Sequence, residues 1–229
     1  MNQPQPEIAF IQAEMHCHTV WSLDSSNRIP DLLAAARGRG IQRLAITDHN
    51  TIRGALAAKE KDPDLVVVGE EILTTRGELL AYYVKEEIPK RLTPMQTIEK
   101  LKKQGAVIAI PHVFDVRRHG WRREDLQEML PYIDALEVFN ARCLSRGVND
   151  KAIQFARQTG LPGFAGSDAH SLLELGLAAT YVPAFNCAAE LRAALHRARY
   201  AGQLLSVGQH LRASLKIGLG RLHPHKKSP

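Results

Sequence analysis

The stretch Gly163-Phe-Ala-Gly-Ser-Asp-Ala-His170 ends a short apolar segment with two side chains of metal-binding type, Asp168 and His170. Far away in the chain, Met15-His-Cys-His18 ends another apolar segment with two histidines. Residues i and i+2 of a β-strand point to the same face. His16 and His18 can therefore bind one ion, and Asp168 and His170 can line one cavity. A metal centre that joined the two pairs would also close the fold.

Length and composition indicate an ordinary globular protein. The chain has 229 residues, which fits one domain with a substantial core, and is 45% hydrophobic and 24% charged. No apolar run is long enough to cross a membrane, and residues 1–6 lack the basic and apolar regions of a signal peptide. The three cysteines are scattered, which is typical of reduced thiols. We therefore expect a cytoplasmic protein without a membrane partner.

The net charge of +6 is concentrated near the C-terminus, because eight Lys or Arg and no acidic residue follow Glu190. This charge alone favours a solvated tail and helix face over contact with nucleic acid, acidic lipid or a protein partner. Nucleic acid stays a candidate partner of this segment. We expect a main domain over residues 1–203 and a basic segment over residues 204–229 that is partly helical or disordered.

Apolar strand-like segments alternate with helical ones along the whole domain. Most of these strands are apolar without strict alternation, which favours parallel strands covered by helices. Polar residues recur at their C-terminal ends, the edge where active sites form in β/α barrels. The expected strands are 7–19, 43–49, 65–71, 78–84, 106–112, 134–140, 161–170 and 179–183. The expected helices include 30–38, 51–61, 93–104, 148–159 and 188–199.

Eight residues near these strand ends are candidate metal ligands: His16, His18, Asp24, His49, Glu71, His112, Asp168 and His170. A mixture of imidazole and carboxylate suits zinc, manganese or iron. Eight groups exceed the three or four that one zinc ion takes, so two or three divalent ions are expected. A single histidine such as His49 or His112 is more often structural than a ligand. The pairs at the two ends of the chain are the strongest signals.

These motifs together closely resemble the PHP (polymerase and histidinol phosphatase) family of metal-dependent phosphoesterases. They stand here as His16-Cys-His18, Thr47-Asp-His49, Gly69-Glu-Glu71, Pro111-His112 and Gly166-Ser-Asp-Ala-His170. The resemblance covers most of residues 12–185 and implies an α/β fold with a single-domain, distorted (β/α)7 TIM-like barrel. It implies a first ion on His16, His18, Glu71 and Asp168, a second on Glu71 and His112, and a third among Asp24, His49 and His170.

One position departs from the family pattern. Family members commonly carry a histidine in the strand after the bridging glutamate, where this chain has Glu78-Leu-Leu-Ala81. Either Glu78 is a carboxylate ligand, which zinc and manganese accept, or the second ion is weak or absent.

The expected chemistry is hydrolysis of a phosphate ester by a metal-bridging hydroxide. Ions lower the pKa of bound water and neutralise phosphoryl oxygens during attack. Glu71 would bridge ions, Asp168 would orient the nucleophile and accept its proton, and His170 or Asp24 would assist the leaving oxygen. Arg142 is the first choice for binding phosphate, since an arginine can fork onto it, and Arg117 and Arg118 on the loop after His112 are further candidates.

Three functions are compatible with these residues. The first is a hydrolase that acts on a phosphorylated small metabolite or nucleotide. The second is a nuclease acting on nucleic acid ends, with the basic segment gripping the backbone. The third is a non-catalytic domain that keeps its metal for stability or interaction. The near-complete ligand set favours catalysis.

Overall fold

The computed structural model of the chain describes residues 9–206 and 208–209. The basic segment expected over residues 204–229 therefore lies almost entirely outside the described residues. No helix in the described part is both long and apolar enough to span a bilayer. The strands there are β1 (Phe10–Cys17), β2 (Arg43–Ile46), β3 (Val66–Leu73), β4 (Glu78–Tyr82), β5 (Val107–Ile110), β6 (Ala135–Asn140), β7 (Gly163–Gly166), β8 (Ala178–Pro183) and β9 (Arg199–Gly202). The helices are α1 (Ile29–Gly38), α2 (Arg53–Lys61), α3 (Pro94–Gln104), α4 (Arg123–Met129), α5 (Arg146–Thr159) and α6 (Ala188–Leu195), with 3-10 turns η1 (Val116–Arg118) and η2 (Leu130–Tyr132).

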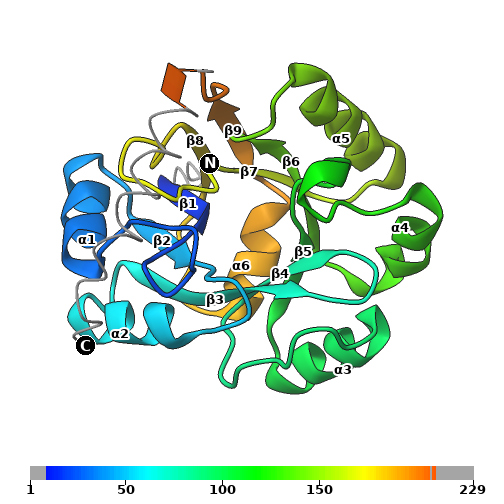
Figure 1. Ribbon diagram of the computed structural model, residues 1–229, viewed down its shortest axis with the longest axis horizontal. Coiled ribbons are helices and arrows are strands. Elements are labelled where there is room, and N and C mark those ends of the chain that lie inside the picture. Colours follow the sequence, from blue (N-terminus) through cyan, green and yellow to red (C-terminus); the bar gives the residue numbers. More distant parts are fainter. Residues whose placement is uncertain (1–8, 207, 210–229) are drawn as a thin grey trace, which may run out of the picture.

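Within the described residues the strands form one sheet in the order β7-β6-β5-β4-β3-β2-β1-β8-β9. The sheet curls into a nearly closed ring, with helices α1 to α5 around its outside (Figure 1). Backbone hydrogen bonds between the C-terminal ends of β1 and β7 close the ring: Asp168 N donates to His16 O at 2.7 Å and His18 N donates to Ala169 O at 3.0 Å. The predicted distorted barrel is confirmed.

The expectation of parallel strands throughout is wrong for two strands, β4 and β8. β4 is antiparallel to both β3 and β5, and β8 is antiparallel to β1 and β9. Only residues 74–77 separate β3 from β4, which is too short for the crossover that a parallel pair needs. Thr74 N instead donates to Gly77 O at 2.9 Å and closes a hairpin.

The last predicted helix is too long. It was expected to reach Arg199, but α6 ends at Leu195 and residues 199–202 form β9 on the edge of β8. Both Arg197 N and Ala198 N still bond to carbonyls of the helix, so the chain turns there. Every residue of β9 is exposed, so the strand has no buried face to give it an apolar pattern.

Helix α6 fills one end of the barrel. In Figure 1 it is seen through the ring of strands. Its Leu191 and Leu195 pack in the interior cluster with inward-facing strand residues such as Phe164. Arg192 Nε contacts Asp134 Oδ1 at 3.1 Å, just before β6, which places α6 at the N-terminal ends of the parallel strands. The opposite rim is left open for a site.

Candidate metal centre

The candidate ligands meet at the open rim. His16 and His18 come from the end of β1, Glu71 lies in β3, and His112 and Asp168 directly follow β5 and β7. Glu78 reaches the same rim because β4 runs the opposite way, so its first residue pairs with Leu73 at the end of β3. The hairpin that contradicts an all-parallel sheet is thus what positions Glu78.

The bridge predicted at Glu71 lies at the centre of the histidines. Its Oε2 is 3.3 Å from Nε2 of both His16 and His18 and 3.0 Å from His49 Nδ1. Its Oε1 is 3.0 Å from His112 Nε2. A buried carboxylate surrounded by four imidazoles is the arrangement expected of a ligand shared between cations.

Asp168 provides the second shared carboxylate. Its Oδ1 lies 3.2 Å from His18 Nε2, 3.6 Å from His16 Nε2 and 3.4 Å from His170 Nδ1. Asp24 comes from the loop after β1, and its Oδ2 is 3.1 Å from His170 Nε2 and 3.5 Å from His49 Nε2. All eight sequence-predicted ligands therefore converge in one place.

The atoms in this place fit a group of cations. Among buried side-chain atoms, Nε2 of His16, Nε2 of His18, Oε2 of Glu71 and Oδ1 of Asp24 make no hydrogen bond. Leaving such atoms buried and unbonded is costly, and a cation would satisfy them. Three groups have ligand atoms within 4.8 Å of one another: His16, His18 and Asp168; His18, His49 and His170; and His49, Glu71 and Glu78.

Other side chains fix the orientation of the histidines. His16 Nδ1 is 3.0 Å from Glu137 Oε1, which turns Nε2 of the same ring toward Glu71. The other carboxylate oxygen of Glu137 accepts a bond from His112 N at 2.7 Å. Such partners of ligating imidazoles set their tautomer and raise their basicity. Glu137 therefore orients the side chain of His16 and holds the backbone of His112.

A second orienting chain was missed by sequence reasoning. His18 Nδ1 lies 3.2 Å from Ser22 Oγ, and that hydroxyl donates to Asp48 Oδ1 at 2.7 Å. Asp48 also accepts bonds from the backbone and hydroxyl of Thr19 at 2.7 and 2.6 Å. The only sequence signal was the position of Asp48 beside His49, which did not reveal its partner on another loop.

Burial and neighbouring charge oppose each other across the cluster. Burial disfavours the charged imidazole of His16, but Asp168, Glu71 and Glu137 outweigh it and raise its pKa well above the usual value. Burial and the charges of His170 and His49 lower the pKa of His18. Burial would raise the pKa of Glu71, yet His16 and His49 hold it well below its normal range. Cations bind ionised carboxylates and neutral imidazoles. Glu71 and His18 are therefore already in the form that binds a cation, whereas His16 would have to lose a proton.

Glu78 lies beside the predicted second ion site. Its Oε2 is 3.5 Å from His112 Nε2, and burial followed by the charge of Glu71 raises its pKa to about 9. A cation beside Glu78 would favour its ionised form. The geometry agrees with a carboxylate in the place of the usual histidine.

The arginine in the site is Arg118. Its Nη1 donates to Asp168 Oδ2, its Nη2 donates to Asn140 Oδ1 at 3.0 Å, and its Nε donates to Asp115 Oδ2 at 3.2 Å. Burial opposes its charge, but Asp168 outweighs burial and raises the pKa of Arg118. Arg142 instead lies 3.4 Å from the buried Glu174, and the Arg117 side chain is exposed. Phosphate binding by Arg142 and Arg117 stays a prediction.

The backbone at two ligands adopts unusual conformations. His112 and Asp168 have φ angles of 30° and 53°, in the region that favours glycine. Such conformations persist only where the surroundings hold them, and they cluster at functional sites. Gly166 is required nearby, because a Cβ there would lie 2.4 Å from Glu137 Oε1 and 2.5 Å from His16 Cβ.

Comparison with known proteins assigns this centre to a family. The PHP domain model matches residues 14–107, and a PHP-associated model matches residues 146–200. The chain belongs to the PHP family. The uncharacterized protein MJ1587 of Methanocaldococcus jannaschii is 38% identical over 158 residues, which make up 62% of this chain and 90% of that one. The predicted PHP membership is confirmed, and PHP proteins are generally hydrolases of phosphoester bonds.

Solved structures share the PHP barrel with this chain. PsfC from Pseudomonas syringae has a TM-score of 0.69 and 15% identity, with 92% of this chain and 98% of that one covered. The lesion-specific endonuclease EndoQ from Pyrococcus furiosus has a TM-score of 0.61 and 16% identity, with 85% of this chain and 59% of that one covered. At these identities the likeness shows the fold.

Proposed function

We propose that this PHP protein is a phosphoesterase that uses two or three divalent metal ions to hydrolyse a phosphate ester of a small metabolite or nucleotide. One observation carries the proposal: histidines and carboxylates from distant parts of the chain meet around Glu71 Oε2, and that oxygen and Nε2 of both His16 and His18 make no hydrogen bond. Zinc, manganese and iron all accept such a donor set.

The proposed ligands follow the distances. His16, His18, Glu71 and Asp168 would hold the first ion, and Glu71, His112 and Glu78 the second. Asp24, His49 and His170 would hold the third, with His49 near enough to Glu71 to serve either neighbour. Ions bound there would supply hydroxide at neutral pH and neutralise phosphoryl oxygens.

The remaining chemistry belongs to side chains of the rim. Asp168 would orient the attacking water and accept its proton. Asp168 is ionised, because His16 and Arg118 outweigh burial and hold its pKa well below the usual value. Arg118 would hold Asp168 in place and present a cation to the phosphoryl group. His170 or Asp24, whose Nε2 and Oδ2 atoms are 3.1 Å apart, would assist the departure of the leaving oxygen.

The test is a panel of phosphomonoesters and diesters offered to the purified, manganese-loaded chain. We expect turnover, and we expect His18→Ala to reduce kcat/KM by at least about 100-fold, because it removes a ligand that contacts both shared carboxylates. His196→Ala, an exposed histidine just after α6, is the matched control and should keep the activity. Near-normal hydrolysis by His18→Ala would show that the proposed site is wrong.

A nuclease is the second candidate, because one structural neighbour is an endonuclease. Binding of a long nucleic acid releases counterions, so the rate of its hydrolysis should fall steeply with added salt. A rate on single-stranded oligonucleotides that exceeds the rate on monoesters and falls in this way would favour the nuclease.

A further inference from the structure

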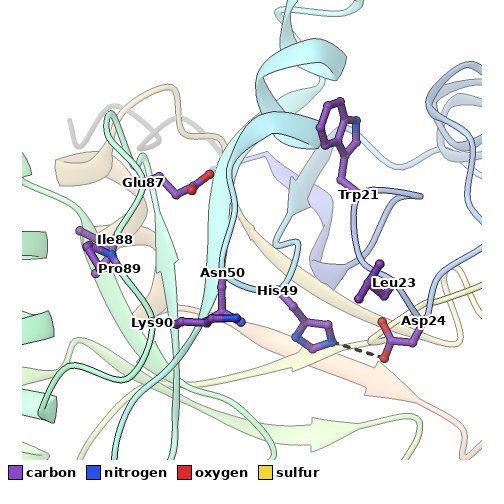
Figure 2. Close-up of a pocket in the computed structure, with 9 residues that line it drawn as sticks. All are labelled: Trp21, Leu23, Asp24, His49, Asn50, Glu87, Ile88, Pro89 and Lys90. Atoms are coloured by element: carbon purple, nitrogen blue, oxygen red, sulfur yellow. Dashed lines mark ion pairs between the residues drawn. The ribbon is translucent and has the colours of Figure 1, made fainter. Parts of the chain in front are cut away.

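A cavity of about 570 Å³ opens beside the proposed metal centre. It is lined by Trp21, Leu23, Asp24, His49, Asn50, Glu87, Ile88, Pro89 and Lys90 (Figure 2). Asp24 and His49 belong to both the cavity and the centre, and their ion pair marks the boundary between the two. A volume of this size accepts a small organic molecule. The cavity is therefore in position to hold the part of a phosphate ester beyond the phosphate.

The wall of the cavity carries both apolar and polar side chains. Trp21, Leu23, Ile88 and Pro89 supply aromatic and aliphatic surface. Lys90 is the single Lys or Arg among the lining residues, and Figure 2 shows its side chain directed toward Asn50 and His49. The cavity thus combines metal ligands, an apolar wall and one ammonium group.

Lys90 has no carboxylate partner in the described part of the chain. The two carboxylates of the cavity wall have other partners. Glu87 Oε2 accepts from Thr51 Oγ1 at 2.6 Å and from Ile52 N at 3.3 Å, and Asp24 pairs with His49 and His170. The ammonium charge of Lys90 is therefore available to a ligand in the cavity.

The loop that carries Lys90 is anchored on both sides. Ile88 N donates to Oε2 of the buried Glu70 at 3.1 Å, and Arg91 N donates to Leu73 O at 2.6 Å. Glu70 thus faces away from the metal centre and positions this loop. Because the backbone of this loop is already fixed, less conformational entropy is lost when a ligand binds.

We propose that this cavity binds the alcohol part of the substrate and that Lys90 pairs with a second anionic group on it. The substrate class is then a phosphate ester whose alcohol has an apolar body and a further carboxylate or phosphate. This inference rests on the proposed function and adds a specificity-determining residue to it.

The experiment compares phenyl phosphate with 4-carboxyphenyl phosphate and 1,4-phenylene bisphosphate on the manganese-loaded full chain. The two substrates with a second anionic group distinguish a carboxylate from a phosphate as the preferred second group. We expect at least one of them to exceed phenyl phosphate in kcat/KM by about fivefold through a lower KM, the size typical of one partly exposed ion pair. Lys90→Ala should bring that ratio to about one, and Lys90→Arg should preserve it. Lys85→Ala, on the same loop but outside the cavity wall, should also preserve the ratio.

Binding of non-hydrolysable analogues keeps the inference separate from the proposed function. If the carboxylate substrate is the preferred one, titration calorimetry should show that 4-carboxyphenylphosphonate binds more tightly than phenylphosphonate. Lys90→Ala should remove this difference in affinity. Absence of turnover on every ester would defeat the proposed function. A wild-type protein that turns over phenyl phosphate without any preference for either second anion, or a preference that survives Lys90→Ala, would overturn the role of Lys90.

Discussion

Glu137 shows how one residue outside the ligand set controls the metal centre. Its carboxylate faces His16 Nδ1 with one oxygen and accepts from His112 N and Asn140 Nδ2 with the other. It therefore fixes the ring of one proposed ligand and the backbone of another. Glu137 is buried, and its Oε1 lies close against Gly166, where a Cβ would leave no room for it.

Glu137→Gln is expected to weaken metal binding. The amide keeps the shape of the side chain but removes the charge that makes His16 more basic, so manganese affinity should fall by about 10- to 100-fold. Titration calorimetry with manganese measures the change. Glu99→Gln, an exposed position on α3, is the matched control. Equal affinities for Glu137→Gln and the wild type would remove Glu137 from the centre.

At the scale of elements, the two ends of the barrel have different tasks. Helix α6 closes the end formed by the N-terminal ends of the parallel strands, and the loops after the strands form the metal centre at the other end. Stability and chemistry are thereby separated along the barrel axis. Hydrophobic burial at one end holds the strands whose opposite ends must position the ligands.

Leu191→Ala is expected to reduce stability. Leu191 is fully buried against the barrel interior, and truncation of such a leucine lowers the free energy of unfolding by about 2–5 kcal/mol through lost burial and the cavity left behind. Urea denaturation of the metal-free protein measures this. The matched truncation Leu56→Ala, at a position 43% exposed on α2, should cost less than about 1 kcal/mol. Similar losses in both variants would contradict a plug role for α6.

At the scale of the whole molecule, the metal centre joins segments that are far apart in the sequence. His16 and His18 belong to β1, whereas Asp168 and His170 follow β7, and backbone bonds close the ring between them. Ions shared by these residues would connect the first and last strands of the barrel a second time. Metal binding at the proposed site would therefore be linked to folding of the entire domain.

Metal is expected to raise the melting temperature more at high pH than at low pH. The pKa values of His16 and His49 are raised in the metal-free protein, because nearby carboxylates outweigh the effect of burial. Their protonation stabilises that form below about pH 6.5, and the contribution is lost as pH rises through the raised pKa values. Cations require the neutral rings, so their binding has the opposite dependence.

Differential scanning calorimetry with manganese or with a chelator, at about pH 6 and about pH 8, tests this linkage. The increase in melting temperature caused by manganese should be larger at the higher pH and nearly absent in His18→Ala. An increment that shrinks as the pH rises would contradict the proposed ligands.

The sequence by itself determined the features that local patterns encode. Thr93, Pro94 and Gly105 marked the ends of α3, and the structure has the capping box at Thr93 and a φ of 75° at Gly105. Histidines and carboxylates just past apolar strands identified the candidate ligands, because strand ends at one edge of a barrel must meet. The resemblance to the PHP family predicted the seven-stranded barrel. It also identified Glu78 as the residue that stands where family members commonly have a histidine.

Only the tertiary structure decided what depends on long-range contacts. The direction of β4 follows from a hairpin. The contact of Arg118 with Asp168 follows from the 3-10 turn that carries Arg118, and the contact of Ser22 with Asp48 joins two loops. Strand periodicity reports burial but not the identity of the partner, since any neighbouring strand can bury the same face. The candidate metal ligands could be named from the sequence, whereas the side chains that orient them were identified only in the folded structure.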